Sequence, residues 1–376
     1  MSFNETPGTP SHPYLFPPYE PREIEIIIPN LNSRYSGVTA AAAAVIPHQV
    51  KAFSFAQTGY ALPIDIPSLG LRELLRLTAQ PLPGGRPRIF HARRNIEMLA
   101  GLALRDIFHR KLHLVFTSVA QRHHTAWTRF LYSRMDTLIS TSPRSASFLL
   151  RPVTAIVPHG VDTEIFRPAT DRKLAWAESG APGRYGVGIF GRVRPQKGVE
   201  EFVDALCRVL PRYPNFTAVI IGETTPQFAA FETRLKERTR GQKLENRFIW
   251  PGKLPTEEVR KWFRRVSLVA AVSRNEGFGL TCLEAMASGA AVVGTQTGAF
   301  DMIIRDGEDG LIVPCCDTTA LAGAFDRLLS SPNELVRMGA TARQRVCDSF
   351  SIHREAEGLN AVYLNILQKT HYKAGR

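Results

Sequence analysis

Two carboxylates eight positions apart bracket a glycine-rich turn in the second half of the chain. Glu276 precedes Gly277 and Gly279, and Glu284 lies about one turn inside the helix-forming stretch 280–287. An apolar run, 267–272, comes directly before this turn and is typical of a buried strand. Strand, glycine turn and helix in that order bring unpaired backbone N–H groups and the positive end of a helix dipole to one point. The pattern suits a phosphate group, although such a unit is often purely structural in α/β proteins.

Two cationic side chains form a second group, directly after another apolar run, 185–190. Arg192 and Lys197 lie between Gly191 and Gly198. A guanidinium can fork onto phosphate oxygens, and an ammonium adds a point charge. The segment matches neither GxxxxGK[ST] nor GxGxxG, so a basic solvated loop is the alternative. Together with the turn after Glu276, the two cations favour a diphosphate ligand.

Both groups belong to a chain in which short apolar runs alternate with amphipathic stretches. Strands are predicted over 23–29, 88–92, 112–118, 137–141 and 153–158, and then over 185–191, 216–222, 248–252, 267–272, 291–294 and 310–314. Helices are predicted over 38–46, 95–108, 199–210, 226–238, 256–264, 280–287, 333–347 and 352–368. This alternation predicts the α/β class, with two Rossmann-like doubly wound domains that face a cleft.

The length of 376 residues also favours two domains. The pattern breaks around 158–183, which is polar and rich in proline and glycine. We predict a flexible leader over 1–21, an N-terminal Rossmann-like domain over 22–165 and a C-terminal Rossmann-like domain over 166–350. A C-terminal helix over 351–376 is expected to pack back on the first domain. The leader is polar and proline-rich and does not have the pattern of a signal peptide.

The charge is strongly positive and unevenly distributed. The net charge is +13, and residues 71–151 hold 14 Lys and Arg against four acids. A basic solvated surface is one interpretation, and an anionic acceptor, a bilayer or a nucleic acid is another. Because no nucleic-acid-binding motif accompanies the charge, we favour an anionic acceptor or bilayer. No apolar stretch approaches the roughly 20 residues of a membrane helix.

Metal and nucleophile chemistry finds little support in the sequence. The five cysteines are odd in number and lack metal-ligand spacing, so we expect reduced thiols of a cytosolic protein. The pair His123 and His124 has no Cys or Glu at ligand spacing, and no GxSxG motif is present. The sequence therefore predicts neither a zinc site nor a serine nucleophile.

The two groups taken together resemble the family-four retaining glycosyltransferases of GT-B fold. The resemblance rests on Gly-Arg-x4-Lys-Gly at 191–198 and on Glu-x7-Glu at 276–284. Supporting pieces are His-Gly-Val-Asp at 159–162, the strand before Gly222, Trp-Pro-Gly-Lys-Leu at 250–254 and Asp-Gly-Glu-Asp-Gly at 306–310. The resemblance is strong over 155–350 and weaker before it. It implies that the domain over 22–165 binds the acceptor and that the domain over 166–350 binds the nucleotide sugar.

The resemblance implies a role for each matching residue. The counterparts of Arg192 and Lys197 hold the donor diphosphate, that of Glu276 contacts the sugar hydroxyls, and that of Glu284 holds the ribose. The implied donor-binding set is Gly37, Arg192, Lys197, Gly222, Lys253, Leu254, Glu276, Gly277, Phe278, Gly279, Leu280, Thr281 and Glu284. The family generally needs no metal, because cationic side chains stabilise the leaving diphosphate. The resemblance therefore implies no metal and no cofactor.

The histidine that many family members carry after the strand 112–118 is missing here. That place is Val-Phe-Thr-Ser at 115–118, whereas His123 and His124 follow a few residues later and His91 ends the preceding strand. We predict that His124 takes the catalytic role together with Glu276, Arg192 and Lys197. The alternatives are that His91 or His123 takes this role, or that these are surface or capping histidines.

The Phe-Thr-Ser-x-x-Gln-Arg-His-His stretch at 116–124 and the Pro-His-Gly-Val-Asp stretch at 158–162 make the lipopolysaccharide core mannosyltransferases the most similar group. The resemblance implies transfer of mannose from GDP-mannose to the inner core, next to the Kdo sugars on lipid A. The enzyme would be cytoplasmic and would touch the anionic inner membrane peripherally. The alternatives are a UDP-sugar donor, a phosphoinositide acceptor, a nucleotide-sugar epimerase and a nucleic-acid-binding protein.

Overall fold

The structure is a computed structural model that describes residues 23–33 and 36–369 of the 376. The chain divides into two compact units. Of the described residues, unit 1 holds 23–33, 36–116, 130–137 and 360–369, whereas unit 2 holds 117–129 and 138–359. The predicted leader, 1–21, lies outside the described residues. The boundaries placed at 165 and 350 remain predictions.

The first sheet has seven strands in the order β3-β2-β1-β4-β5-β6-β7. Its central strand β1 pairs in parallel with β2, Ile26 opposite Phe55, and with β4, Ile26 opposite Ile89. The strands are β1 Ile26–Asn30, β2 Phe55–Gly59, β3 Ser68–Leu69, β4 Arg88–Ala92, β5 Leu112–Ser118, β6 Thr137–Ser140 and β7 Ala155–Ile156. All five residues of β1 are buried, as expected for a parallel sheet that is covered on both faces.

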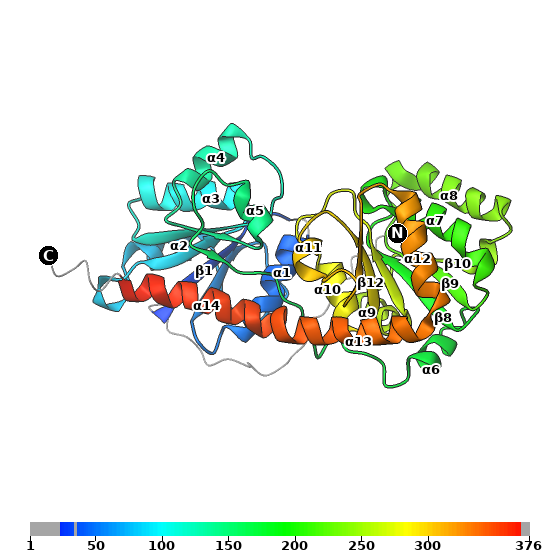
Figure 1. The fold of residues 1–376 in the computed structure, drawn as a ribbon. Helices are drawn as coiled ribbons and strands as arrows, with labels where there is room; N and C mark the ends of the chain where they lie inside the picture. The colour runs from blue at the N-terminus through cyan, green and yellow to red at the C-terminus, as the bar shows by residue number, and fades with distance from the viewer. Residues whose placement is uncertain (1–22, 34–35, 370–376) are drawn as a thin grey trace, which may run out of the picture. The chain divides into compact units, whose positions relative to one another are not determined.

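Helices alternate with these strands, and the predicted helices over 38–46 and 95–108 are joined by three that were not predicted, over 71–79, 126–133 and 143–147. They are α1 Gly37–Val45, α2 Leu71–Ala79, α3 Asn95–Leu102 with the π-helical turn η4 Ala103–Ile107, α4 Ala126–Ser133 and α5 Pro143–Ser147. The last helix, α14 Ile352–Lys369, brings Tyr363 into unit 1, where its ring packs edge-on against Phe53 and Phe55. Figure 1 shows this helix in red beside the blue strands of unit 1.

The second sheet has six strands in the order β10-β9-β8-β11-β12-β13. The register is parallel, with Val187 opposite both Ala218 and Leu268, and Val269 opposite Val292. The strands are β8 Tyr185–Phe190, β9 Phe216–Ile221, β10 Phe248–Gly252, β11 Leu268–Ala271, β12 Ala291–Thr295 and β13 Leu311–Val313.

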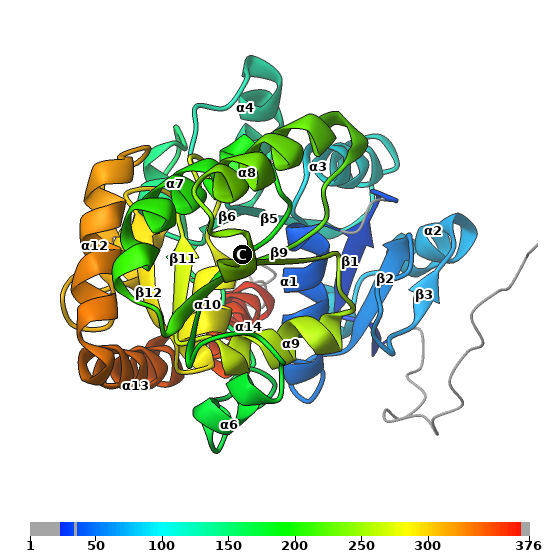
Figure 2. The ribbon, with the colours of Figure 1, turned by 90° about the vertical axis from the view of Figure 1, so that its right-hand side faces the viewer.

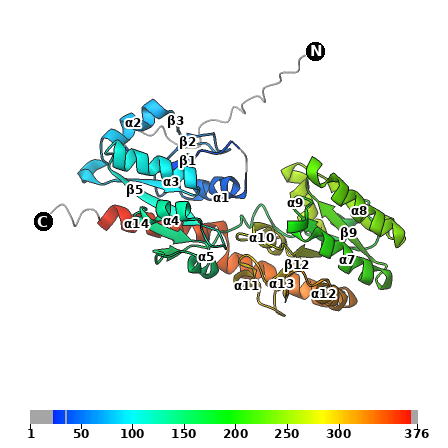
Figure 3. The ribbon, with the colours of Figure 1, turned by 90° about the horizontal axis from the view of Figure 1, so that it is seen from above.

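Helices bury both faces of this second sheet. One core contains side chains such as Phe202 and Phe325 from α7 Val199–Val209, α8 Ala229–Gly241 and α12 Thr318–Ser330. The other contains side chains such as Trp262 and Met286 from α6 Arg172–Ala177, α9 Thr256–Arg265 and α10 Leu280–Ala287. The helix α13 Pro332–Ser349 contributes to both cores. Figure 2 shows α7 and α8 on one side of β9 and β11 with α6 and α9 on the other, and Figure 3 shows α12 beside α13.

The strand order reverses once in each sheet, between β1 and β4 and between β8 and β11. Ligands of doubly wound sheets bind at the carboxyl ends of the strands, next to such a reversal. The predicted fold class, two doubly wound Rossmann-like halves, is confirmed. None of the helices in the described ranges combines the length and the apolar character that crossing a bilayer requires.

Candidate active site

Two loops of unit 2 meet at the carboxyl ends of β8 and β11. The loop after β8 carries Arg192 and ends in the short 3₁₀ helix η5 Pro195–Lys197. Gly198 then adopts φ +72°, and a Cβ at this position would lie 2.0 Å from the carbonyl oxygen of Val272. Only glycine permits this approach, which holds the basic loop against the end of β11.

Lys197 and Glu276 form an ion pair between these two loops. The Nζ of Lys197 lies 2.6 Å from Oε2 of Glu276, and the two side chains are 24% and 22% exposed. The same carboxylate oxygen accepts a hydrogen bond from the Ser273 hydroxyl at 3.2 Å. A Cβ on Gly298 would lie 3.0 Å from the Cβ of Glu276, so the loop after β12 also packs against it. Glu276 is therefore held by three loops.

The helix α10 begins at the end of the second loop. Gly279 precedes it with φ +110°, and a Cβ there would lie 2.2 Å from the Phe300 ring. Gly279 has no side chain that could cap the helix. The first-turn amides of Leu280 and Thr281 therefore lie at an uncapped helix N-terminus, the positive end of the helix dipole. The Phe278 ring is buried and packs edge-on against His159, 5.2 Å between centroids. Only the backbone of Phe278 is left to meet a ligand.

A cavity of about 290 Å³ opens beside these loops. A Cβ on Gly222 would lie 1.9 Å from the Gly191 carbonyl oxygen, so the ends of β8 and β9 are in close contact at its wall. Lys253 lies 3.7 Å from Glu223 at the rim. The lining consists of Phe190, Gly191, Arg192, Ile221, Gly222, Glu223, Lys253, Leu254, Val259, Phe263, Thr281 and Glu284.

Glu284 supplies the one desolvated carboxyl in this cavity lining. Burial raises the pKa of Glu284 to about 7, because desolvation disfavours the carboxylate, and the positive charge of Arg260 opposes that shift only in part. A carboxylate in this state gains strongly from hydrogen-bond donors, and the two hydroxyls of a ribose are suitable donors.

Most of the predicted donor-binding residues therefore come together in unit 2. Arg192, Gly222, Lys253, Leu254, Thr281 and Glu284 line the cavity, and Lys197 and Glu276 through Leu280 belong to the same two loops. Gly37 is the first residue of α1 in unit 1, and His124 lies between β5 and α4 and does not line this cavity. The roles of Gly37 and His124 remain predictions.

The histidines have different environments. His91 is fully buried, and its Nδ1 lies 2.6 Å from the Tyr363 hydroxyl. Burial, reinforced by the charge of Arg93, lowers the pKa of His91 well below its usual value. Burial, reinforced by the charge of Arg122, also lowers the pKa of His124. His123 packs edge-on against Phe148. His91 is thus a core residue, whereas His124 is only partly buried.

A polar cluster occupies the corresponding strand reversal of unit 1. Arg94, directly after β4, donates to the Thr39 hydroxyl and to Glu97 at 2.7 Å each, to Ser36 at 3.0 Å and to Asn30 at 3.2 Å. A Cβ on Gly37 would meet no heavy atom within 4 Å among the described residues. Packing within unit 1 therefore does not require glycine there, and close approach of a ligand remains the predicted reason for it.

Two features of the site were not identified from the sequence. Ser273 reaches Glu276, but a serine beside an apolar strand carries no distinctive signal. Val259 and Phe263 of α9 line the cavity, and their i, i+4 spacing on an amphipathic helix was the available signal. Within the described ranges no three His, Cys, Asp or Glu residues lie close enough to hold a metal ion. Metal independence itself remains a prediction.

Comparison with known proteins places these features in one family. The model for glycosyl transferases group 1 matches residues 176–345. The chain is 43% identical over 347 residues to the lipopolysaccharide core biosynthesis mannosyltransferase LpcC of Rhizobium leguminosarum bv. viciae, covering 92% of this chain and 97% of the relative. It is 40% identical over 352 residues to the lipopolysaccharide core biosynthesis mannosyltransferase LpsB of Rhizobium meliloti, covering 92% and 99%.

A solved structure extends the likeness to the fold. The Anabaena protein HepE, crystallised with UDP and glucose, superposes with a TM-score of 0.74. The alignment covers 91% of this chain and 100% of that chain, at 17% sequence identity. At this identity the likeness describes the fold alone, and both halves of the present chain take part in it.

Proposed function

Because this chain belongs to the group 1 glycosyltransferases and has the GT-B fold, we propose that it transfers mannose from GDP-mannose to the inner core of lipopolysaccharide. The acceptor would be lipid A that carries Kdo sugars, and the configuration at the anomeric carbon would be retained. The names of two relatives support mannose and the lipopolysaccharide core. The charged site in unit 2 supports a nucleotide diphosphate as the leaving group.

The observation that carries the proposal is the Lys197–Glu276 ion pair beside the cavity that Arg192 and Glu284 line. The ribose would bind Glu284 in the cavity, and the diphosphate would lie between Arg192, Lys197 and the first-turn amides of α10. On donor binding, Lys197 exchanges its contact with Glu276 for a phosphate oxygen. Glu276 is then available to accept hydrogen bonds from the sugar hydroxyls.

The proposed mechanism depends on stabilising the departing diphosphate. Negative charge grows on the phosphate oxygens as the glycosidic bond breaks, and preorganised cations and amides stabilise that charge most in the transition state. Two side-chain cations and one helix N-terminus supply this stabilisation without a metal or other cofactor. The acceptor hydroxyl attacks the anomeric carbon from the face that the diphosphate leaves, and the departing phosphate takes the proton of that hydroxyl. No protein nucleophile is needed for retention.

The first sheet and the helices around it supply the surface that we assign to the acceptor and the membrane. The basic stretch 71–151 matches the negative charges of Kdo carboxylates and lipid A phosphates. On α4, Trp127 and Phe130 are 52% and 53% exposed, next to the exposed Arg129. Aromatic rings and arginines together suit the headgroup region of an anionic bilayer. We place the enzyme at the cytoplasmic face of the inner membrane.

A donor and acceptor panel tests the proposed reaction. The purified chain is incubated with GDP-mannose, UDP-glucose or UDP-galactose, with or without Kdo-bearing lipid A, and nucleotide release and glycolipid mass are measured. We expect GDP release that depends on the acceptor, and a product heavier by one hexose. Turnover with UDP-sugars alone would contradict the donor, and conversion of GDP-mannose without any acceptor would indicate an epimerase.

Vesicle sedimentation tests the membrane contact separately. The wild type is expected to bind vesicles that contain phosphatidylglycerol, and the W127S/F130S variant to bind about tenfold more weakly, since two apolar anchors are lost. Leu364→Ser removes an exposed apolar side chain from α14 and serves as the control. Equal binding by all three proteins would contradict the assigned surface.

A further inference from the structure

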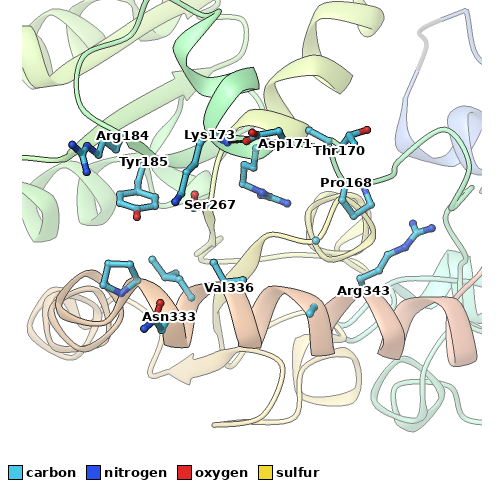
Figure 4. Close-up of a pocket in the computed structure, with 16 residues that line it drawn as sticks. Pro168, Thr170, Asp171, Lys173, Arg184, Tyr185, Ser267, Asn333, Val336 and Arg343 are labelled. Carbon is cyan, nitrogen blue, oxygen red and sulfur yellow. Dashed lines mark hydrogen bonds between the residues drawn. The ribbon is translucent and has the colours of Figure 1, made fainter.

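A second cavity lies at the opposite, amino-terminal ends of the strands of the second sheet. Its volume is about 680 Å³. Tyr185 begins β8, Ser267 directly precedes β11 and Gly289 precedes β12, and all three line it. Figure 4 shows Lys173, Tyr185 and Ser267 on one wall and Asn333 and Val336 of α13 on the other. The donor cavity lies at the carboxyl ends of these strands, so the two sites are separate.

The lining of this second cavity is strongly cationic. It holds Arg172, Lys173, Arg184 and Arg343 but a single acid, Asp171. The Oδ1 of Asp171 accepts hydrogen bonds from the amides of Lys173 and Leu174 at 2.8 and 3.0 Å, as the N-cap of α6. The one carboxylate is therefore engaged by backbone and pairs with none of the four cations.

Two of the four guanidinium and ammonium groups are fixed by backbone carbonyls. Arg172 donates to the carbonyl oxygens of Val266 and Ser288, which end α9 and α10. A Cβ on Gly289 would lie 3.1 Å from Nη2 of Arg172, so glycine leaves room for this guanidinium. Arg343 donates to the carbonyl oxygens of Thr163, Phe166 and Ala287, each at 2.8 Å.

No carboxylate in the described residues pairs with Arg172 or Arg343, so their positive charge is compensated only by carbonyl dipoles. Burial lowers the pKa of Arg172 to about 10, and the side chain therefore still carries its charge at pH 7. A desolvated guanidinium without an anion is unfavourable, and an anionic ligand would relieve that cost.

The other two cations are available to a ligand. Lys173 and Arg184 are exposed, and neither forms an ion pair within the described ranges. The helix α13 begins at the cavity with Pro332, and the preceding Ser331 makes no side-chain cap. Its first-turn amides add partial positive charge to the same space. Pro168, Leu335 and Val336 give the lining an apolar part.

We propose that this cavity is a second anion-binding site, which takes a phosphate-bearing molecule with a small apolar or sugar part. Lys173 and Arg184 would contact the phosphate, and Arg172 and Arg343 would position the walls and add charge. Residues 168–173, in the segment that connects the two sheets along the chain, form part of the lining. Ligand binding is therefore expected to protect this segment from hydrogen exchange.

Calorimetry and hydrogen exchange on the full chain test the site. Glucose 1-phosphate is titrated into protein saturated with GDP, and into the K197A variant, so that donor binding is not counted. The charge-reversed variant K173E/R184E is expected to bind glucose 1-phosphate at least about tenfold more weakly than wild type. The control R240E/R337E carries the same charge change on exposed arginines outside the lining and is expected to bind like wild type.

A second arm separates a soluble phosphate ester from a lipid headgroup. Vesicles that contain phosphatidylglycerol replace glucose 1-phosphate, and the same four proteins are compared. Vesicle binding that only K173E/R184E weakens, without a response to glucose 1-phosphate, assigns the site to a phospholipid headgroup. Equal binding of both probes by K173E/R184E and by R240E/R337E, or no binding of either probe by wild type, overturns the proposal. Failure of GDP binding would refute the donor site and leave this test intact.

Discussion

Lys197 is the residue on which the proposed chemistry depends most. Replacing it by alanine removes one of two side-chain cations from the diphosphate site, and we expect kcat/KM to fall by about 100- to 1,000-fold. The melting temperature should change little, because an ion pair this exposed contributes about 0–1 kcal/mol. Nucleotide release and thermal unfolding are measured on the same preparation.

Lys261→Ala is the matched control for that experiment. Lys261 is an exposed lysine on α9, outside the lining of the donor cavity, and pairs with Glu258 at 2.7 Å. This variant is expected to turn over at the wild-type rate. Normal turnover by a folded K197A enzyme would remove the diphosphate site, and the proposed transferase mechanism with it.

Glu284 gives the donor site a pH dependence of definite sign. Its pKa is about 7, so the carboxyl is mostly protonated at pH 6 and mostly ionised at pH 8. The carboxylate is the better acceptor for ribose hydroxyls, and GDP affinity is therefore expected to rise from pH 6 to pH 8. The diphosphate also titrates near pH 6. The relevant quantity is thus the rise in wild type beyond that of E284Q, measured by calorimetry, and parallel profiles would contradict the assignment.

The same group affects the stability of the unliganded protein in the opposite direction. The folded-state pKa of Glu284 is raised above its ordinary value of 4.5, so folding favours the protonated form. The protonated carboxyl therefore contributes its full share to the free energy of unfolding below pH 4.5. That share, up to about 3 kcal/mol, is lost as the pH rises through 7. E284Q is expected to be more stable than wild type at pH 8 and equal at pH 4.5 in urea unfolding. Equal stability at both values would show that the carboxyl is solvated.

The sequence predicted the charged members of the site, because each belongs to a local motif beside a strand end. Lys197 and Glu276 are 79 residues apart, yet their meeting follows from the adjacency of β8 and β11. Ser273 could not be predicted in this way, since its contact depends on the rotamer of Glu276. The raised pKa of Glu284 could not be predicted either, because it depends on how deeply the folded chain buries the carboxyl.

At the scale of elements, the absence of a Cβ at Gly198 lets the loop after β8 pack against the end of β11. Gly198 and Gly180 have nearly the same φ, +72° and +70°, but a Cβ on Gly180 would meet nothing within 4 Å. Gly180→Ala is expected to lower the free energy of unfolding by about 1 kcal/mol, because only the left-handed backbone conformation disfavours the alanine. Gly198→Ala adds a clash with the Val272 carbonyl and is expected to cost about 3 kcal/mol or more. Urea unfolding of both variants measures the difference, and equal costs would mean that the loop relaxes freely.

Strands with continuous apolar runs were predicted nearly to their ends, whereas β2 and β3 were missed. β2 includes Gln57 and Thr58, and these polar residues interrupt the apolar run that would have predicted a buried strand. In the structure Gln57 Oε1 accepts from the Leu62 amide at 2.6 Å, and the Thr58 hydroxyl donates to the Leu69 carbonyl at 3.0 Å. Buried polar groups are tolerated when they are satisfied in this way, and such partners are not visible in the sequence.

At the scale of the whole molecule, one helix contributes to both compact units. In unit 2, Glu355 of α14 lies 2.8 Å from Nδ1 of His159 and accepts from the Gly160 amide at 2.8 Å. The same helix then enters unit 1 with Tyr363. The sequence predicted a terminal helix that packs back on the first domain, but the residues that anchor it could not be recognised, because each pairs with a partner roughly 200 residues or more away.

Tyr363 tests whether the two units lose stability separately. Its ring packs against Phe53, Phe55 and His91, so Tyr363→Ala is expected to cost unit 1 about 3–5 kcal/mol. Tyr363→Phe keeps the ring and loses the hydrogen bond to His91, at a cost of about 1 kcal/mol. Segment-resolved hydrogen exchange should show the loss in β1, β2 and β4, while GDP affinity in unit 2 stays within about twofold. If β8 and β11 lost protection to the same extent, the two units would unfold as one, and donor binding could not be treated as a property of unit 2 alone.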